Sequence, residues 1–432
     1  MAKAIDSLPG KKGDSALYTG TMVVIPTRNR ASIAMNAIRS VLNQSVEDVN
    51  VLVSDNSTSE KDREALATFC STECNERLRY VRPPRLLPMS EHWDWAIREA
   101  MRFAPASHFL YLTDRMMFRK GALKEVLALA AKYPNKVISY SHDRIIDDVK
   151  PIRVEQYAAT ERLWEVETLR LLWLFSQSIL PNALPRMLNC IAPRSVLAQI
   201  EQRFGNIFCS IAPDFSFCCR CLDTEHSILY FDKAPIFQYA LDRSHGASLT
   251  RGEITPDNTD FTANLPVDNS FRNFATPIPG LNTVANALFN EYFHFKQQTN
   301  SPRFFDVDLQ KYLQYNANEI TQVIDPAVRA DMLSLLIANG YREGSANNHS
   351  RRAGISLVKR FGSKLRRLAT GPSTTPLWLF AGRTLGITPP GQNQFEFATL
   401  SDAIDYSANI SAGNFNKEHS PRELLEAREM LK

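Results

Sequence analysis

The sequence predicts an α/β protein with a mixed, mostly parallel sheet flanked by helices, followed by a mainly helical C-terminal extension. Two observations predict this class. Short runs of β-branched and aromatic residues alternate with helical sequence in the first part of the chain, and three of these runs stop on a polar residue, as strands do at the edge of a parallel sheet. The runs are Thr21–Ile25, Val49–Ser54, Leu78–Val81 and His108–Leu112.

The segment between the first two runs has a helical period. Ala34, Ala37, Ile38, Val41 and Leu42 recur at spacings of three and four, which predicts an amphipathic helix covering one face of the sheet. A strand, a covering helix and a second strand form a βαβ unit, so the first strands should be parallel.

Five parts are expected along the chain: a flexible lead-in at 1–20, the main α/β domain at 21–245, a loop or linker at 246–280, a helical region at 281–345, and a C-terminal extension with a basic amphipathic helix at 346–432. The boundary after the main domain follows from a stretch rich in Asn, Thr, Asp, Pro and Gly. Further expected elements are helices at Gly121–Tyr133, Trp164–Phe175 and Arg194–Phe204, a strand at Lys136–Tyr140, a strand pair within 225–241, and helical sequence from about Thr283 to Ala338.

Composition excludes several classes of protein. Hydrophobic residues make up 44% and charged residues 22% of the 432, which is the balance of a folded protein and not of a disordered one. Lys and Arg number 50 against 46 Asp and Glu, and a formal net charge of +4 gives no argument for a nucleic-acid partner. No run reaches the roughly 18 apolar residues that a membrane span requires.

The cysteines indicate a cytoplasmic protein. There are seven of them, with no secretory signal at the start of the sequence, as in a reducing compartment. Cys218, Cys219 and Cys221 cannot all face one ion from a single helix, so buried free thiols are expected there and not a metal site.

Arg351–Leu368 contains seven basic residues and no acid, with apolar residues at three- and four-residue spacing. This pattern predicts a basic amphipathic helix. Two alternatives remain open for it: peripheral contact with anionic lipid at the inner face of the membrane, or docking on its own protein. The C-terminal part of the chain is also a candidate contact with a bound substrate or with a second copy in a homo-oligomer.

Polar residues follow the first strand, in the segment Ile25–Arg30. Ligands bind beyond the carboxyl ends of parallel strands, and both helix N-terminal amides and guanidinium groups suit phosphate. Pro26, Thr27, Arg28 and Arg30 are therefore candidates for an anion site. The alternative is a turn with solvated arginines.

The second strand ends at the same edge, in Val53-Ser54-Asp55-Asn56-Ser57. A carboxylate there can accept hydrogen bonds from a ribose hydroxyl or a base N–H, which makes Asp55, with Asn56 beside it, a candidate for binding a nucleoside. The alternative is that Asp55 caps the following helix.

Met22–Arg30, Ala37–Ser45 and Val51–Ser57 together resemble the opening of family 2 glycosyltransferases, and the likeness continues more loosely to about residue 245. The resemblance implies a Rossmann-like GT-A fold. It also implies that 21–245 is a catalytic domain that takes a nucleoside diphosphate sugar and inverts the anomeric centre.

The same resemblance implies roles for single residues. Pro26, Thr27 and Arg30 would line the nucleotide site, and Asp55 would bind the nucleoside. Met89–Ile97 resembles the segment where a helix start faces the donor. Within this segment Ser90 is expected to be the N-cap, and Trp93 and Trp95 are expected to pack in the core more than to stack on sugar.

Phe109–Arg115 aligns with the strand that in this family usually ends in an Asp-x-Asp motif, whose carboxylates hold Mg²⁺ or Mn²⁺ against the donor diphosphate. Here the motif reads Thr113-Asp114-Arg115-Met116. A lone aspartate is a poor site for a hard cation, so no firm cofactor is predicted, with Asp114 the ligand if Mg²⁺ or Mn²⁺ is used. Arg115 is expected to neutralise the leaving group instead, with Asp114 orienting Arg115 or contacting the donor sugar. The alternative is that Arg115 points to solvent and activity is lost.

Asp214 lies in Ala212–Phe217, which resembles the acidic segment that supplies the family's catalytic base. An inverting displacement needs a carboxylate near the acceptor hydroxyl, because that oxygen must lose a proton as it attacks. Helix capping is the alternative role for Asp214. Other candidates for the base are Asp143, Asp147 and Asp148.

Asp242–Ser248 resembles the mobile loop that closes over the donor diphosphate in related enzymes. Arg243 and His245 are expected to reach phosphate, and Gly246 supplies hinge freedom.

The resemblance therefore predicts an inverting hexosyltransferase that moves a sugar from a nucleoside diphosphate donor to a hydroxyl of a glycan or a lipid-linked acceptor. It implies bacterial surface polysaccharide or glycoconjugate assembly as the setting. The competing hypothesis is a GT-A-like nucleotide-binding or scaffold protein impaired in catalysis. A nucleotidyltransferase is disfavoured because Pro26–Arg30 contains no glycine for a phosphate loop.

Overall fold

The computed structural model describes residues 19–73, 75–157, 159–253, 273–342 and 394–409, together with residues 259, 261 and 263. The predicted basic helix at Arg351–Leu368 and most of the expected lead-in lie outside these residues.

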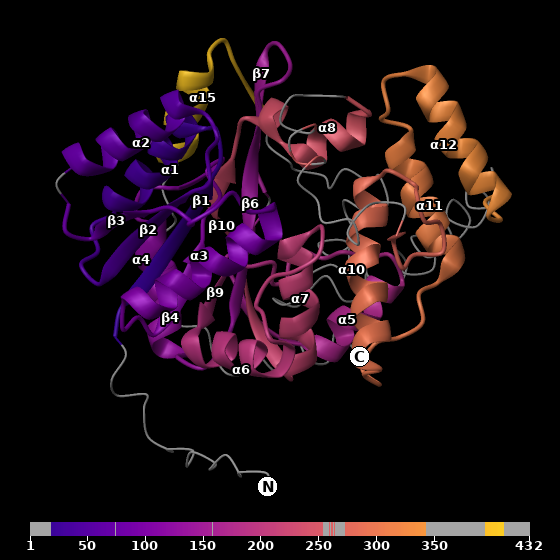
Figure 1. The fold of residues 1–432 in the computed structure, drawn as a ribbon, viewed down its shortest axis with the longest axis horizontal. Coiled ribbons are helices and arrows are strands. Elements are labelled where there is room, and N and C mark those ends of the chain that lie inside the picture. Colours follow the sequence, from indigo (N-terminus) through magenta and orange to yellow (C-terminus); the bar gives the residue numbers. More distant parts are fainter. Residues whose placement is uncertain are drawn as a thin grey trace, which may run out of the picture.

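Within these residues, eleven strands form one mixed sheet, with the path β11-β7-β6-β9-β4-β1-β2-β3 and β10 beside β6 (Figure 1). β3, β2, β1 and β4 are parallel, as predicted, and β9 lies antiparallel between β4 and β6. The strands are β1 Thr21–Thr27, β2 Val49–Asp55, β3 Leu78–Val81, β4 His108–Tyr111, β5 Met116–Phe118, β6 Ile138–Ile146, β7 Ile152–Glu155, β8 Leu163–Glu167, β9 Cys190–Pro193, β10 Ser227–Gln238 and β11 Gln394–Phe397.

Helices cover both faces of the sheet, because β1 is apolar on both sides. Met22 and Val24 belong to the core beneath α3, α6 and α7, whereas Val23 and Ile25 belong to the core beneath α1 and α4. All four side chains are fully buried, as is typical of a central parallel strand. The helices are α1 Ala31–Leu42, α2 Glu60–Thr72, α3 Met89–Phe103, α4 Ala122–Lys132, α5 Thr168–Ser176, α6 Arg194–Phe204, α7 Pro213–Thr224, the 3-10 turn η2 Leu241–Arg243, α8 His245–Arg251, α10 Val284–Thr299, α11 Leu309–Ile320, α12 Pro326–Ala338 and α15 Leu400–Asn409.

Two predicted elements are wrong in type. Trp164–Phe175, predicted as one helix, begins as strand β8, and α5 starts only at Thr168. The strand pair expected within 225–241 is one long strand, β10, which pairs with β8 on one side and β6 on the other. In both cases a short apolar run has no period that distinguishes helix from buried strand, and pairing across the sheet decides the outcome.

The C-terminal region contains helices, as predicted. α10 packs against α7, and α10, α11 and α12 lie together at one end of the sheet (Figure 1). The final described segment lies at the β7 edge of the sheet, where β11 pairs antiparallel with β7 and α15 packs on both strands. None of the described helices combines the length and apolar character needed to traverse a lipid bilayer.

Candidate functional site

The carboxyl ends of β1, β2 and β4 bring predicted site residues to one edge of the sheet. Thr27 at the end of β1 is paired with Asp55 at the end of β2. Asp114 follows β4, the neighbour of β1 on the other side, and its Oδ2 accepts a hydrogen bond from the Thr27 hydroxyl at 2.9 Å. The Asp114 Oδ1 lies 3.5 Å from Arg30 Nη1. Thr27, Arg30 and Asp114 thus form one buried cluster, called here the rim cluster.

Arg115 lies in the turn between β4 and β5, directly after the rim cluster. With the Gln238 carboxamide turned so that its oxygen faces Arg115, that oxygen accepts from both Nη atoms at 3.1 and 3.2 Å. The Tyr239 N–H donates to the Arg115 carbonyl oxygen at 3.1 Å. The end of β10 therefore holds both the backbone and the guanidinium of Arg115 beside the rim.

Two more predicted arginines flank the turn after β1. Arg243 in η2 donates from Nη2 to the Asn29 carbonyl oxygen at 3.4 Å. The 3-10 turn η2 therefore lies beside the loop that follows β1. Arg28 Nη1 lies 3.5 Å from the Leu87 carbonyl oxygen. His245 begins α8, and its side chain is not among the described groups. The turn after β1 is therefore lined by guanidinium groups from two separate segments.

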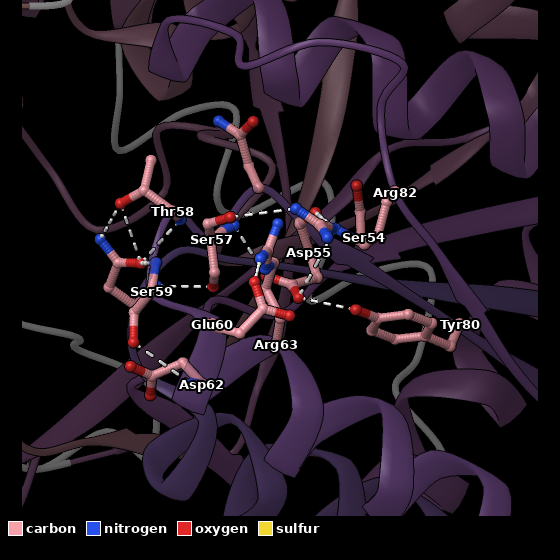
Figure 2. Close-up of polar contacts among 12 residues, drawn as sticks. Ser54, Asp55, Ser57, Thr58, Ser59, Glu60, Asp62, Arg63, Tyr80 and Arg82 are labelled. Atoms are coloured by element: carbon pink, nitrogen blue, oxygen red, sulfur yellow. Dashed lines mark hydrogen bonds and ion pairs between the residues drawn. The ribbon is translucent and has the colours of Figure 1, made fainter.

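Asp55 is enclosed by its neighbours (Figure 2). It is 0% exposed, its Oδ1 accepts the Ser57 N–H at 2.8 Å, and its Oδ2 accepts the Tyr80 hydroxyl at 2.7 Å. Arg82 Nε lies 4.0 Å from the same Oδ2. The capping alternative for Asp55 is wrong, because the N-cap of α2 is Ser59. A nucleoside that reaches Asp55 would meet Tyr80 and Arg82 first.

Tyr80 and Arg82 were not predicted, although a signal was available. They lie at the end of β3, and the rule that located Asp55 at the end of β2 applies equally to a third parallel strand. Pro26, by contrast, lies inside β1, paired with Ser54.

Asn56 and Ser90 lie beside the rim. The Asn56 amide donates to the Leu87 carbonyl oxygen at 2.7 Å and accepts from the Leu87 N–H at 3.1 Å, which ties the end of β2 to the loop before α3. The prediction that Ser90 is an N-cap is wrong. Pro88 occupies that position with an extended ψ of 157°, and Ser90 lies buried inside the first turn.

The backbone amides at the start of α1 are used within the protein. Asp62 Oδ1 accepts the Ala31 N–H at 3.0 Å, and Ser57 Oγ accepts the Asn29 N–H at 2.8 Å. Asn29 has a φ of +55°, which its side chain stabilises by accepting the N–H groups of Thr58 and Ser59. An anion at this edge must therefore rely more on guanidinium groups than on helix amides.

His92 in α3 was also not predicted as part of this region. Its Nε2 forms a 2.8 Å hydrogen bond with Ser54 at the end of β2. Burial, assisted by the charge of Arg28, lowers the pKa of His92 to about 3. The imidazole is therefore neutral near pH 7.

This buried histidine predicts acid lability. The unfolded chain binds a proton on His92 below pH 6.5 while the folded chain does not, so stability is present above that pH and is lost as the pH falls toward 3. We expect a loss of about 1.4 kcal/mol in the free energy of unfolding per pH unit from this group. Urea unfolding at pH 7, 6 and 5 measures the slope. His92→Gln should flatten it, whereas the exposed His226→Gln should not; an unchanged slope in His92→Gln contradicts the assignment.

Asp214 lies in the first turn of α7, which covers the same face of the sheet as α3. The N-cap of α7 is Ala212, so the capping alternative for Asp214 is wrong. Burial raises the pKa of the half-buried Asp214 carboxyl, while Arg186 and backbone N–H groups act in the opposite direction. The hydrogen bonds and ion pair of the rim cluster do not include Asp214.

The three alternative carboxylates have structural partners. Asp143 forms a buried ion pair with Arg119. Asp147 accepts two backbone N–H groups of the turn that leads into η2, at 2.7 and 2.9 Å. Asp148 pairs with Arg251 at 2.9 Å. Of the four candidates, Asp214 is the one that lies at the start of a helix and near a cation, Arg186. The described contacts give it no ion pair like those of Asp143 and Asp148.

The residues at the rim do not fit a divalent cation. Mg²⁺ needs six oxygen ligands in near-ideal geometry, whereas Asp114 is a single carboxylate already engaged by Thr27 and Arg30 and followed by the cationic Arg115. In the described part of the chain no three His, Cys, Asp or Glu side chains form a metal-binding group. The thiols of Cys218, Cys219 and Cys221 are buried and free, as predicted.

The chain resembles known proteins in sequence and in structure. The sequence profile of glycosyl transferase family 2 matches residues 22–183. No curated protein sequence matches the chain. Among solved structures, S. aureus TarS 1–349 in complex with UDP-GlcNAc is similar at 16% identity, covering 78% of this chain and 92% of that chain, with a TM-score of 0.43. The same protein in complex with UDP has 15% identity, the same coverage and a TM-score of 0.38.

Proposed function

We propose that this chain, whose residues 22–183 match the profile of glycosyl transferase family 2, moves a sugar from a nucleoside diphosphate donor to a hydroxyl acceptor with inversion. The observation that carries the proposal is the rim cluster with Arg115 beside it. It joins the ends of β1 and β4, within the matched residues, at the sheet edge where α/β proteins bind their ligands.

The donor subsite follows from the charges around this edge. Arg28, Arg30, Arg115 and Arg243 supply guanidinium groups, which match phosphate oxygens with paired N–H donors. Asp55, with Tyr80 and Arg82 over it, lies on the far side of β1 from Asp114, where the nucleoside would bind. Thr27 at the end of β1 lies between the two, and its hydrogen bond, with the Arg30 ion pair, holds the Asp114 carboxylate that would face the donor sugar.

The reaction is a single displacement. The acceptor oxygen attacks the anomeric carbon, its proton passes to the Asp214 carboxylate, and the bond from the anomeric carbon to the diphosphate oxygen breaks with both electrons going to the diphosphate. The Arg115 guanidinium neutralises the charge that develops on that leaving group, a term that is usually large because it acts only in the transition state. No step is routed through a metal ion.

For the acceptor, the proposal names only a chemical class. A hydroxyl of a glycan or of a lipid-linked glycan, in bacterial surface-glycan assembly, is the class that the family resemblance supports. Residues 351–368 remain a candidate contact with lipid or with the protein itself, and they lie outside the described residues.

A thermal-shift screen with UDP-, GDP-, CDP- and dTDP-sugars tests the donor class. A true donor at about 100 times its Kd should add ~2.7 kcal/mol of stability and raise the Tm. Thr27→Val should weaken binding of that donor about tenfold, because it removes the hydrogen bond that fixes Asp114.

The matched control is Thr321→Val, which removes an exposed hydroxyl on α11's end. It should leave donor binding unchanged. Transfer to simple sugar acceptors, with the product anomer read by NMR, then tests the reaction. A donor that binds but is never transferred or hydrolysed by the native chain would favour the scaffold hypothesis instead.

A further inference from the structure

Glu291 connects the C-terminal helices to the start of α7. It belongs to α10, outside the segment that matches the family, and it is 2% exposed. Its Oε1 accepts the Ile211 N–H at 3.2 Å and the Ala212 N–H at 3.0 Å. Ala212 is the N-cap of α7 and has no side-chain acceptor of its own. The carboxyl group of another helix therefore holds the two amides that lead into α7.

The turn held by Glu291 places Asp214, which follows two residues after Ala212. Ser210 in this turn has a φ of +63°, which is uncommon for a residue with a side chain and persists only where surrounding contacts support it. The Cys209 N–H donates to Ser216 Oγ at 3.0 Å, so the turn is closed onto α7 from both sides. Loss of the Glu291 contacts would leave the direction of Asp214 much less defined.

Glu291 and Asp214 are also coupled by charge. Burial raises the pKa of Glu291 to about 8, and the charge of Asp214 acts in the same direction. Hydrogen bonds from Ala212, Ser210 and Ile211 act to lower the pKa of Glu291. Arg186 favours the ionised form of Asp214. The remaining titratable or charged neighbours are the thiols of Cys209 and Cys219, which burial keeps protonated, and Arg220 beside them. In such a pair one member ionises first, and here Arg186 favours Asp214.

We propose that Glu291 is the positioning residue of the catalytic base: a buried carboxylic acid whose oxygen holds the turn before α7 while Asp214 carries the negative charge. The inference rests on the proposed function, in which Asp214 removes the acceptor proton. It extends the functional unit beyond the family domain, because a helix of the C-terminal region then shapes the acceptor side of the site.

Two substitutions in the full chain test the role. Glu291→Gln keeps an oxygen that accepts the two amides and is neutral like the protonated acid, so kcat should stay within about threefold of native. Glu291→Leu removes the acceptor and should lower kcat at least about tenfold, with the donor KM unchanged because the rim cluster is untouched. A general loss of structure would instead change both constants.

Glu319 supplies a matched control. It is a half-buried carboxyl group on α11 whose two oxygens accept the Val284 and Ala285 N–H groups at 2.7 Å each, a similar contact at the start of α10. Glu319→Leu should lower the Tm and leave kcat near native. Glu291→Leu with native kcat, or Glu291→Gln as inactive as Asp214→Asn, would overturn the proposal.

The pH dependence of stability is a second readout, which also applies if Glu291→Leu does not fold. A carboxyl whose folded pKa is about 8 stabilises the folded chain below its ordinary pKa of 4.5 and loses that stability as the pH rises through 8. The Tm of the native chain should therefore fall more steeply between pH 5 and 8 than that of Glu291→Gln. Equal slopes overturn the proposal. If Asp214→Asn keeps native activity, the base assignment itself is wrong, whatever the Glu291 variants do.

Discussion

Asp214→Asn is expected to lower kcat for sugar transfer about 10³-fold while donor binding stays within about twofold. Asparagine has the same shape but cannot take up the acceptor proton. Donor affinity should persist because the hydrogen bonds and ion pair described for the rim cluster and for Asp55 do not involve Asp214. Transfer measured with a radiolabelled or fluorescent acceptor, beside a thermal shift with donor, separates the two effects.

The pH profile of the native chain sharpens this prediction. Because burial raises the pKa of Asp214 above its ordinary 3.8, the activity of the native chain should increase with pH as this carboxyl loses its proton. The residual activity of Asp214→Asn should not show that increase. Asp223→Asn is a suitable control, since Asp223 lies near the other end of α7 and pairs with Arg203. It should alter stability and leave kcat unchanged. Native kcat in Asp214→Asn would mean that another group removes the proton.

Arg115→Met is expected to lower kcat by 10²- to 10³-fold, the range reported for loss of one preorganised charge-stabilising group. Methionine keeps most of the side-chain length and removes the charge that, in the proposed reaction, faces the leaving diphosphate. Arg115→Lys should restore part of the activity, because a point charge returns without the paired N–H groups. Steady-state kinetics with saturating donor measures both.

Chelation provides the complementary test. If Arg115 neutralises the leaving group, the activity of the native chain should survive exhaustive treatment with EDTA. The control for the Arg115 substitutions is Arg79→Met, which removes an exposed arginine that lies over the Phe103 ring. Its kcat should equal that of the native chain. Activity that disappears with EDTA and returns with Mn²⁺ would assign the leaving-group charge to a metal ion.

The sequence predicts the first half of the sheet closely, because parallel strands are buried on both faces and interrupted by amphipathic helices. β3 and α6 have the predicted bounds, and β1 and β2 extend each prediction by one or two residues. The later strands are harder. β8 and β10 depend on partners that are distant in the chain, and a local apolar run does not reveal whether such a partner exists.

The candidate site divides in the same way. Residues that follow a strand end were predictable, since topology alone brings Thr27, Asp55 and Asp114 to one edge. Glu291 was not, because no local pattern relates a glutamate in one helix to the amides that begin another. Tyr80 lies between these cases: its place at a strand end follows from the sequence, but an aromatic residue is common in any strand and does not by itself indicate a ligand site.

The pairing of β11 with β7 affects the order in which the protein can be completed. During synthesis β7 emerges from the ribosome long before the residues that cover it, so its edge remains open while the whole helical region is made. An open strand edge is a template for pairing with other polypeptides. The nascent chain is therefore exposed to wrong partners until β11 arrives.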